Sequence, residues 1–400
     1  MALNEVLKKL EGDRVIWMVT ILLSILSLLA VYSSISTLAY KANGDSFKFL
    51  FKHGVMLALG MLVVYAVHLA KLKYIFKLST AMLYAAGALL FLTLLIGSNI
   101  NDASRWLKIP FFNLTFQTSE FAKIALVVYV AKALTIRRTL LHDFKQGIVP
   151  ILIPIAIICG LILPEDFSTA ALLFLVCLLI LYIGGVPFKH LAKIVGLGMM
   201  CLVFIYLIGK AAPGTITRFD TWTNRIESFA NPEDKGNYQI QLSQIAIYNG
   251  GVLPHGPGTG TSRNYLPHPY SDMIYAFIIE EYGAILGGFG LLLLYLILLF
   301  RTIRMSLKSP KHFGGLMALG LAFMLVSQAI VNMGVAVNLF PTTGQPLPLV
   351  SMGGTSTIFT LLIIGLILAV SRTVYNPEEI QKGESNRVKN SSKGGEYVPA

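Results

Sequence analysis

Charged residues are scarce in this sequence. Asp, Glu, Lys and Arg make up only 13% of its 400 residues, whereas hydrophobic residues make up 55%. A chain of this size with so few charged side chains cannot cover a soluble surface, so the composition excludes an ordinary soluble protein. The apolar residues gather in runs of about 20 residues, the length that crosses a membrane as a helix. The sequence therefore predicts an all-α integral membrane protein.

Cysteine is also scarce. The three cysteines, Cys159, Cys177 and Cys201, lie inside apolar runs and have neither CxxC nor Cys/His spacing. This pattern excludes a disulfide framework and a structural zinc site, so we interpret them as small core residues. The net charge of +12 would suggest a nucleic-acid partner in a soluble protein. In a membrane protein the charge has to be read loop by loop, and we expect no nucleic-acid binding.

The apolar runs predict about ten transmembrane helices. The first, from about Val15 to Leu38, follows a basic segment but is too long for a signal peptide and lacks an Ala-x-Ala exit, so we expect it to remain. The others lie near residues 50–69, 75–97, 119–136, 147–163, 168–185, 191–211, 273–300, 314–338 and 356–372.

The basic residues of the short loops predict the orientation. With the amino terminus in the cytoplasm, the loops on that side hold most of the lysines and arginines, so the positive-inside rule places both termini in the cytoplasm. The chain then divides into a polytopic membrane domain at 1–375 and a tail at 376–400. A large extracytoplasmic loop at 212–271 connects helices 7 and 8 of this domain. The polar composition of the tail predicts a disordered cytoplasmic end.

Few ionisable residues lie in the predicted spans, and each is a candidate functional residue because its burial is costly. Glu120 and Lys123 lie three residues apart at the outer end of the fourth span, where they can pair on one face of a helix. The pair is either a packing contact or a polar wall of a substrate cavity. Upstream, Arg105 precedes Trp106, a combination typical of an interfacial anchor.

Two further carboxylate positions lie on the predicted outer side. Glu165 and Asp166 are adjacent at the turn between the fifth and sixth spans, as exposed turn acids or as part of a site. Asp272 lies where the large loop meets an apolar helix. It either caps that helix or, because it is partly desolvated there, serves as a base for proton abstraction.

Two outer loops have unusual composition. The glycine-rich run at 250–262 permits close backbone approach to a ligand, but it lacks Walker A spacing and a preceding strand, so it does not indicate a nucleotide site. The last outer loop, residues 338–356, is charge-free and rich in Pro, Gly and hydroxyl side chains. Such backbone lies at membrane depth only when it is buried in protein or lines a wet cavity. The unusual segments of the sequence therefore lie on the predicted outer face.

These segments resemble the motifs of the SEDS family of bacterial cell-wall proteins, which includes FtsW, RodA and SpoVE. The resemblance covers about residues 10 to 375. The motifs that carry it are Arg105-Trp106, Gln117 with Ser119-Glu120 and Lys123, Asp166 with Thr169, Tyr238-Gln239, the Gly258/Gly260/Ser262 run, Leu266-Pro267, Asp272, Glu280 to Gly283, and Pro341 to Ser356. The chain departs from the family pattern at Thr118, at 164–169, and at His268, which lies two residues further from Asp272 than is common.

The resemblance implies a peptidoglycan glycosyltransferase that polymerises lipid II at the outer face of the bacterial cytoplasmic membrane. It also implies a class B penicillin-binding protein as a partner, with other membrane proteins of the division machinery. Lipid II carries its sugar through a diphosphate leaving group, so a base for the acceptor hydroxyl is sufficient, and Asp272 is the expected catalytic residue. The residues expected to bind substrate are Arg105, Gln117, Glu120, Lys123, Asp166, Arg225, Ser262, Glu281, Thr343 and Ser351.

The sequence does not decide which groups stabilise the negative charge of the leaving diphosphate. One possibility is a divalent cation, Mg²⁺ or Mn²⁺, held by Asp272 with Glu120 or Asp166. The other is a set of basic side chains, for which the sequence offers Arg105, Lys123, Arg218, Arg225 and Arg263.

Three alternative functions remain beside a division polymerase. A lipid II flippase would suit intramembrane Glu120 and Lys123, but alternating access needs a midplane site and gates on both faces, whereas the unusual segments gather on one face. A scaffold that only recruits the transpeptidase leaves the Asp272 loop unexplained. Within the family, the tail and the modest loop lengths favour a division role at the septum, as in FtsW, over an elongation role, as in RodA.

Overall fold

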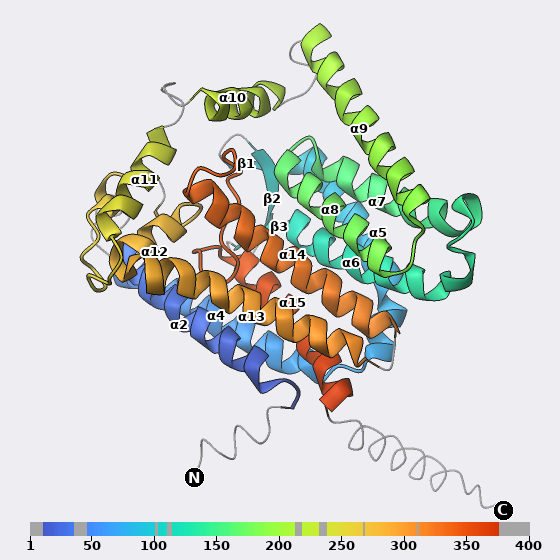
Figure 1. Ribbon diagram of the computed structural model, residues 1–400, viewed down its shortest axis with the longest axis horizontal. Coiled ribbons are helices and arrows are strands. Elements are labelled where there is room, and N and C mark those ends of the chain that lie inside the picture. The colour runs from blue at the N-terminus through green and yellow to red at the C-terminus, as the bar shows by residue number, and fades with distance from the viewer. Residues whose placement is uncertain are drawn as a thin grey trace, which may run out of the picture.

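The computed structural model describes residues 11–35, 46–100, 103–109, 114–212, 218–231, 238–266, 269–309 and 312–375. These residues form a bundle of helices with three short strands at one end (Figure 1). The helical membrane class predicted from the composition is confirmed. The predicted tail at 376–400 lies outside the described residues, as does His268.

Every predicted span coincides with a helical segment. In chain order these are α2 (Arg14–Ser34), α4 (Ser46–His68), α5 (Leu72–Ile96), α6 (Thr118–Ile136), α7 (Val149–Ile162), α8 (Phe167–Ile183), α9 (Phe188–Ala211), α12 (Ile274–Tyr282) continued through the π-helical turn Gly283–Gly290 into α13 (Leu291–Leu307), α14 (His312–Ala336) and α15 (Thr355–Tyr375).

Eight apolar helical segments of the described chain are long enough to cross a membrane. Of the remaining predicted spans, α8 is apolar but has only 17 residues, and α6 carries Glu120, Lys123 and Lys132. The count of ten crossings therefore stays a prediction for these two helices.

The helices differ sharply in burial, which separates the centre of the bundle from its edge. In the spans of α14 and α15, 78% and 72% of the residues are buried, and α6 is also largely buried between α5, α7, α8 and α14. In α9 the buried share is only 11%, and this helix leans away from the others (Figure 1). The central helices α6, α14 and α15 therefore form the core, and α9 lies at the periphery.

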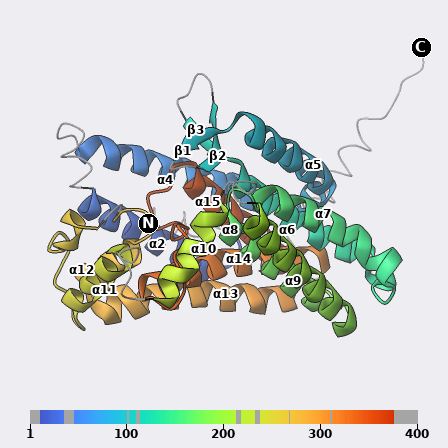
Figure 2. The same ribbon diagram turned by 90° about the horizontal axis from the view of Figure 1, so that it is seen from above.

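The segment between α5 and α6 forms a small sheet that the sequence did not predict. Strands β1 (Ser98–Ile100), β2 (Ala103–Ile109) and β3 (Leu114–Gln117) pair in antiparallel order β1-β2-β3, with Trp106 opposite Gln117. They lie beside the end of α5 (Figure 2). An all-α description was therefore incomplete. The strands β1 and β3 have only three and four residues, and the seven residues of β2 do not alternate strictly between apolar and polar side chains.

The predicted extracytoplasmic loop at 212–271 also contains helices. They are α10 (Phe219–Ala230) and α11 (Tyr238–Gly250), followed by a 3₁₀ turn at Ser262–Asn264. In α10 the apolar residues Phe219, Trp222 and Ile226 recur at helical spacing and share one face. A window sized for a membrane span does not detect this signal, so helices within the loop were not predicted. The extracytoplasmic position of the loop stays a prediction.

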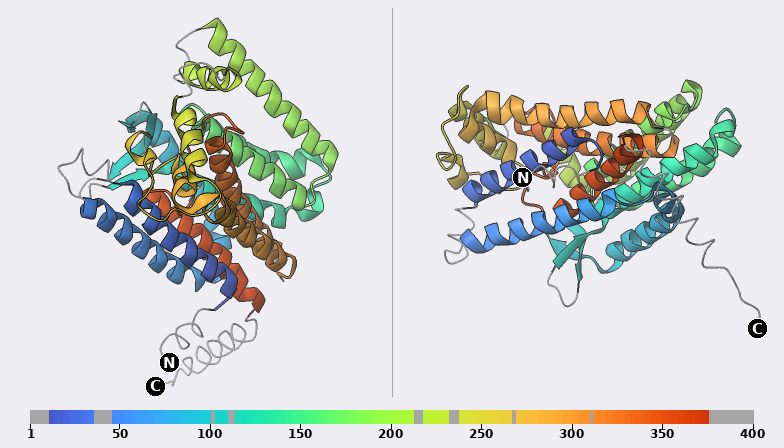
Figure 3. Two further views of the ribbon diagram at one scale, coloured as in Figure 1. Left: turned by 60° about the vertical axis from the view of Figure 1, so that its left-hand side comes forward. Right: turned by 90° about the horizontal axis from the view of Figure 1, so that it is seen from below.

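The two ends of the bundle are distinct. At one end, which we call the sheet end, the Thr355 hydroxyl at the start of α15 donates to the carbonyl of Thr115 in β3, at 2.8 Å. At the other end, the amide of Asp13 donates to Ser371 Oγ at 2.6 Å, and the Arg301 guanidinium of α13 lies 2.6 Å from the Asp13 carboxylate. Helix α13 runs beside α2 (Figure 3). The start of α2 and the end of α15 thus lie on one side. The orientation predicted from the positive-inside rule corresponds to a sheet end on the outer side, and this stays a prediction.

Helices α4 and α15 approach closely because each presents a glycine to the other. A Cβ atom on Gly365 would lie 3.2 Å from the Cα of Val64 and 3.3 Å from its carbonyl oxygen. A Cβ atom on Gly60 would collide with the Leu361 side chain. Small residues of this kind let helix backbones pack tightly in membranes, where van der Waals contact drives association.

We expect Gly365→Leu to lower the free energy of unfolding by about 1–3 kcal/mol, because the added side chain overpacks the contact with Val64. Thermal unfolding in detergent measures this change. The matched control is Gly196→Leu in α9, where a Cβ meets nothing within 4 Å. The control should be neutral or stabilising by up to about 1 kcal/mol, since leucine favours a helix more than glycine does. Equal destabilisation by both variants would contradict the close packing of α4 and α15.

Candidate functional site

A buried ion pair lies in the first turns of α6. Glu120 Oε1 and Lys123 Nζ are 2.8 Å apart, and their side chains are only 9% and 3% exposed. The Lys123 ammonium also donates to Gln328 Oε1 on α14, at 3.1 Å. Buried charges require such pairing and hydrogen bonding. The predicted pairing on one helical face is confirmed, and it ties α6 to α14.

The loop at 338–354, which we call the last loop, enters the bundle at the sheet end. Its residues Leu347, Leu349 and Val350 are buried. Backbone at this depth needs hydrogen-bond partners from the protein, and side chains of several helices supply them. The donors to its carbonyl oxygens are Arg225 of α10 to Thr343 (3.3 Å), Asn332 of α14 to Gln345 (2.8 Å), Gln328 of α14 to Pro346 (3.1 Å), Tyr295 of α13 to Pro348, and Ser27 of α2 to Val350 (2.9 Å).

The turn at 269–273, which we call the Asp272 turn, is fixed against the last loop. The Ser351 hydroxyl donates to the carbonyl oxygen of Ser271 at 2.6 Å. The amide of Met352 donates to the carbonyl oxygen of Tyr270 at 2.9 Å. The predicted site residues Ser351 and Asp272 are therefore neighbours in space, although about 80 residues separate them in the chain.

Two amide side chains hold Asp272 itself. Asn332 Nδ2 donates to the Asp272 backbone carbonyl at 2.7 Å, and Gln239 Nε2 of α11 donates to its carboxylate at 3.3 Å. The aspartate is half-buried, so part of the residue is exposed to solvent. Burial, and then the nearby negative charge of Asp272, raise the pKa of the Tyr270 phenol. Tyr270 is therefore a neutral phenol at neutral pH, next to a carboxylate that can accept a proton.

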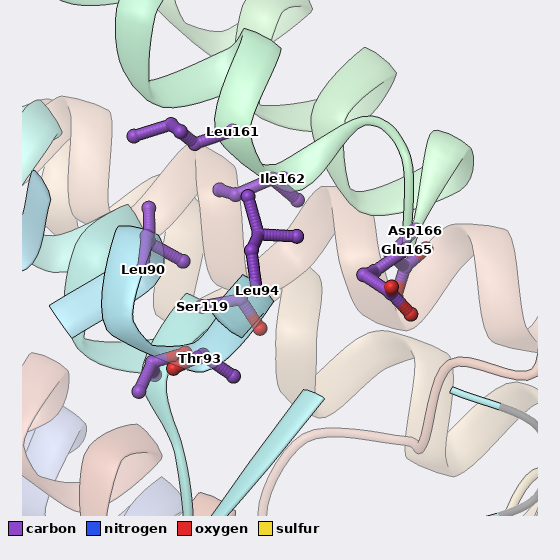
Figure 4. A pocket seen from close by; sticks show the side chains of 9 residues that line it. Leu90, Thr93, Leu94, Ser119, Leu161, Ile162, Glu165 and Asp166 are labelled. Atoms are coloured by element: carbon purple, nitrogen blue, oxygen red, sulfur yellow. Dashed lines mark hydrogen bonds between the residues drawn. The ribbon is translucent and has the colours of Figure 1, made fainter. Parts of the chain in front are cut away.

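Asp166 begins α8 and also lines a pocket. Its carboxylate accepts from the amide of Thr169 at 3.0 Å, and the Thr169 hydroxyl accepts from Gln345 Nε2 of the last loop at 3.2 Å. The pocket has a volume of about 290 Å³, including the part open to solvent. Figure 4 shows Glu165 and Asp166 on one side of it, with Thr93 and Ser119 below. The lining residues are Leu90, Thr93, Leu94, Thr118, Ser119, Leu161, Ile162, Glu165 and Asp166.

Three other predicted residues, Gln117, Arg225 and Thr343, lie beside this region, and a fourth, Arg105, lies on the neighbouring strand β2. Gln117 is the last residue of β3, and its Nε2 donates to Ser119 Oγ at 3.2 Å, next to the pocket. Arg225 and Thr343 are joined by the hydrogen bond from the guanidinium to the carbonyl of the last loop. Arg105 lies in β2, and its side chain is outside the described residues.

Ser262 and Glu281 have a different environment. The Glu281 side chain is fully buried and accepts from the Ser33 hydroxyl of α2 and from the amide of Gly258 at 2.8 Å. Glu280 accepts from the amide of Ser262 at 3.1 Å and from its hydroxyl. The two glutamates thus fold the glycine-rich segment back onto α12. Their observed role is to hold this loop, and a direct role in substrate binding stays a prediction.

The structure therefore divides the predicted site residues into two groups. Those that the last loop and the pocket bring together are Gln117, Glu120, Lys123, Asp166, Arg225, Asp272, Thr343 and Ser351. Ser262 and Glu281 form the second group, near the end of α12. Of the predicted metal ligands, Glu120 pairs with Lys123 and Asp166 accepts from the amide of Thr169, and a metal at Asp272 stays a prediction. No group of three or more His, Cys, Asp or Glu side chains in the described part of the chain is placed to hold a metal ion.

The sequence analysis overlooked the amides that organise this site. Gln328 and Asn332 lie one helical turn apart in the apolar run of α14, on the face that meets the last loop. A polar residue inside a membrane span is itself a signal for function. Both side chains are uncharged, so the criterion of ionisable residues in membrane spans does not select them.

A polar site at one end of a helical membrane bundle defines the class of this protein, and comparison with known proteins identifies the family. The sequence profile of the FtsW/RodA/SpoVE family, described as cell cycle proteins, matches residues 13–376. The chain belongs to this family.

Individual relatives are similar over nearly their whole length. The chain is 33% identical to a probable peptidoglycan glycosyltransferase FtsW of Geobacter sulfurreducens, over 90% of this chain and 95% of that protein. It is 31% identical to the stage V sporulation protein E of Bacillus subtilis, over 91% and 98%.

Solved structures share the fold. One, described as a peptidoglycan synthase complex that coordinates polymerization and crosslinking, contains a chain with 27% identity and a TM-score of 0.71, covering 91% of this chain and 99% of that one. The rod shape determining protein RodA of Thermus thermophilus has 25% identity and a TM-score of 0.65, over 91% and 98%.

We expect Lys123→Met to lower the free energy of unfolding by about 3–5 kcal/mol, because it leaves the Glu120 carboxylate buried without its cation. The double variant Glu120→Gln/Lys123→Met should recover much of this loss, since no charge is then left unpaired. Thermal unfolding in detergent provides the measurement.

The matched control is Lys132→Met on the same helix. Lys132 is half-buried, donates to Thr80 Oγ1 at 2.8 Å and lies 5.0 Å from the centre of the Phe76 ring, with no carboxylate in either contact. Its loss should cost about 1 kcal/mol or less. If Lys123→Met costs no more than this control, the ion pair does not stabilise the core as described.

Proposed function

We propose that this protein is a peptidoglycan glycosyltransferase that polymerises lipid II, with Asp272 as the base. The observation that supports this most directly is that half-buried Asp272 is held beside the last loop, by Asn332 at its backbone carbonyl and by Gln239 at its carboxylate. The membership of the family, and the relatives named as glycosyltransferases, support the same reaction. A base must be held in place while keeping access to its substrate, and Asp272 meets both requirements.

The chemical step needs one proton acceptor. A hydroxyl of the acceptor sugar attacks the anomeric carbon of the lipid-linked donor, and a new glycosidic C–O bond forms. The bond from that carbon to the diphosphate oxygen breaks, and the diphosphate leaves with the electron pair. The hydroxyl proton passes to the Asp272 carboxylate. No protonated carboxyl is needed for departure, because a diphosphate is already a good leaving group.

Negative charge grows on the diphosphate as it leaves, and basic side chains near the last loop are placed to oppose it. Arg225 reaches the last loop at Thr343, and Arg218 reaches the turn before α8 by donating to the Glu165 carbonyl at 2.9 Å. Guanidinium groups bind phosphate oxygens well because their donors match them in pairs. The two arginines therefore extend from the last loop to the edge of the pocket.

A divalent cation is an additional proposal for the same charge. Magnesium is commonly held by one or two carboxylates together with substrate phosphates, and the described residues offer Asp272 for such a role but no preformed cluster. Chelation in a polymerisation assay tests this. Activity lost on chelation and restored by Mg²⁺ or Mn²⁺ would support a cation, whereas unchanged activity would leave the charge to the basic side chains.

The space enclosed by the pocket beside Asp166 is about 20 Å³, room for about one water molecule and far less than a ligand site, so a lipid-linked sugar fits there only if the pocket widens. We propose that Ser119 and Asp166, which line the pocket, bind polar groups of the substrate there, and that Glu120 and Lys123 of the same helix as Ser119 contribute next to it. The apolar residues of α5 and α7 on its wall suit the beginning of a lipid chain.

The biological setting is also a proposal. A class B penicillin-binding protein is the expected partner, and the similar structure from a peptidoglycan synthase complex supports such an assembly. The relatives named FtsW favour a division role at the septum of the bacterial cytoplasmic membrane, with other division proteins nearby.

We expect Asp272→Asn to lower the rate of glycan polymerisation by at least about 100-fold, because a carboxamide cannot accept the proton. The measurement uses purified lipid II in detergent with the class B partner present. The matched control is Asp220→Asn, which changes an exposed aspartate on α10 and should retain the parent rate. Polymerisation by Asp272→Asn at the parent rate would contradict the proposed role of Asp272.

A further inference from the structure

Two buried polar residues outside the proposed site form a hydrogen-bonded pair between α2 and α4. Ser27 Oγ and His53 Nε2 lie 2.8 Å apart, and the two residues are 0% and 1% exposed. The Ser27 hydroxyl also donates to the carbonyl oxygen of Val350 in the last loop, at 2.9 Å. Because a hydroxyl has one proton, and Val350 receives it, the imidazole Nε2 must be the donor to Ser27.

Other hydroxyls of α2 indicate what Ser27 would do without this partner. Thr20 Oγ1 donates to the carbonyl of Ile16 and Ser24 Oγ to that of Thr20, each at 2.8 Å and each four residues earlier on the same helix. This is the usual local bond of a hydroxyl within a helix. Ser27 instead directs its proton to another segment, while His53 donates to its oxygen. The imidazole therefore favours the orientation that reaches Val350.

Val350 follows a backbone position that needs support. Leu349 has a φ of +68°, in the left-handed region that leucine rarely adopts. The carbonyl groups on both sides of it are held, that of Pro348 by the Tyr295 hydroxyl and that of Val350 by Ser27. Such a conformation persists only when its surroundings over-determine it. Losing one of the two anchors would therefore let the turn relax.

This turn leads directly to the proposed base. Ser351 Oγ accepts from the amide of Leu347 at 2.8 Å and donates to the carbonyl of Ser271 at 2.6 Å. Ser271 is the residue before Asp272. A shift of the Leu349 turn therefore moves the Ser351 hydroxyl, and with it the peptide that carries the aspartate.

We propose that His53 and Ser27 are positioning residues, which fix the Leu349 turn and, through Ser351, hold Asp272 where it accepts the proton. The link to catalysis rests on the proposed function. Both side chains act from within the membrane helices, through the last loop.

The first test compares the kinetics of four variants, in complex with the class B partner. Ser27→Ala and His53→Leu should each lower kcat by about tenfold and leave the KM for lipid II unchanged, since a small displacement of a catalytic group affects the chemical step. His53→Gln should stay within about twofold of the parent, because its amide N–H can replace the Nε2 donor. The matched control, Thr20→Val, removes a buried hydroxyl of α2 that bonds only its own helix, and should keep the parent kcat.

The double variant Ser27→Ala/His53→Leu separates a shared route from two independent effects. If both residues act through the same contact with Val350, the double variant should lose no more kcat than either single variant. If the fold-losses of kcat in the two single variants instead multiply in the double variant, the two residues act independently, which contradicts a shared route.

Amide hydrogen exchange of residues 347–352 reads the position of the turn without using activity. Ser27→Ala and His53→Leu should accelerate exchange there by about tenfold, whereas His53→Gln and Thr20→Val should not. Unchanged exchange and unchanged kcat in Ser27→Ala would overturn the proposal. Losses of kcat that merely parallel the losses of thermal stability across the four variants would overturn it as well. A parent that does not polymerise would instead refute the proposed function, and the exchange data would still decide whether the pair holds the turn.

Discussion

The backbone of the last loop must find hydrogen-bond partners inside the bundle, and much of the sheet end depends on this constraint. Water is scarce at this depth, so an unpaired carbonyl would cost several kcal/mol. Side chains from α2, α10, α13 and α14 meet the requirement one carbonyl at a time. Side-chain hydrogen bonds therefore fix the position of a loop that carries no charged residue.

The same contacts bring the chemistry together. Asn332 donates both to the last loop and to the Asp272 carbonyl, and Gln328 connects the loop to the Lys123 ammonium. The Glu120–Lys123 pair therefore supports the site in addition to filling the core. One group of amides thus couples a buried ion pair, an irregular loop and a half-buried carboxylate. Asp272 itself remains half-buried, with part of the residue exposed to solvent.

Much of the helical arrangement could be predicted from the sequence, because long apolar runs have few alternatives in a membrane. Every predicted span coincides with a helical segment, and the Glu120–Lys123 pair follows from its spacing of three residues. The strands at 98–117 could not be predicted in this way, because they are defined by pairing with one another rather than by their composition. Helix α10 could have been predicted, since its apolar residues recur at helical spacing.

Many residues of the site could be predicted from the sequence, but the hydrogen bonds that join them could not. Hydrogen bonds such as Ser351 to Ser271, or Gln345 to Thr169, join residues far apart in the chain, and no spacing rule reveals them. Ser262 and Glu281 illustrate the limit, because their motif predicts a ligand site whereas their contacts fasten a loop. Gln328 and Asn332 were detectable as polar residues in an apolar helix, but not the carbonyls that they serve.

The central claim is that Asp272 accepts a proton from the acceptor sugar at the sheet end. The most direct test is an experimental structure with the class B partner and a lipid-linked glycan acceptor bound. We expect the acceptor hydroxyl within hydrogen-bond distance of the Asp272 carboxylate, at about 2.6–3.2 Å. A sugar bound near the middle of the membrane, away from Asp272, would contradict the claim and favour a flippase.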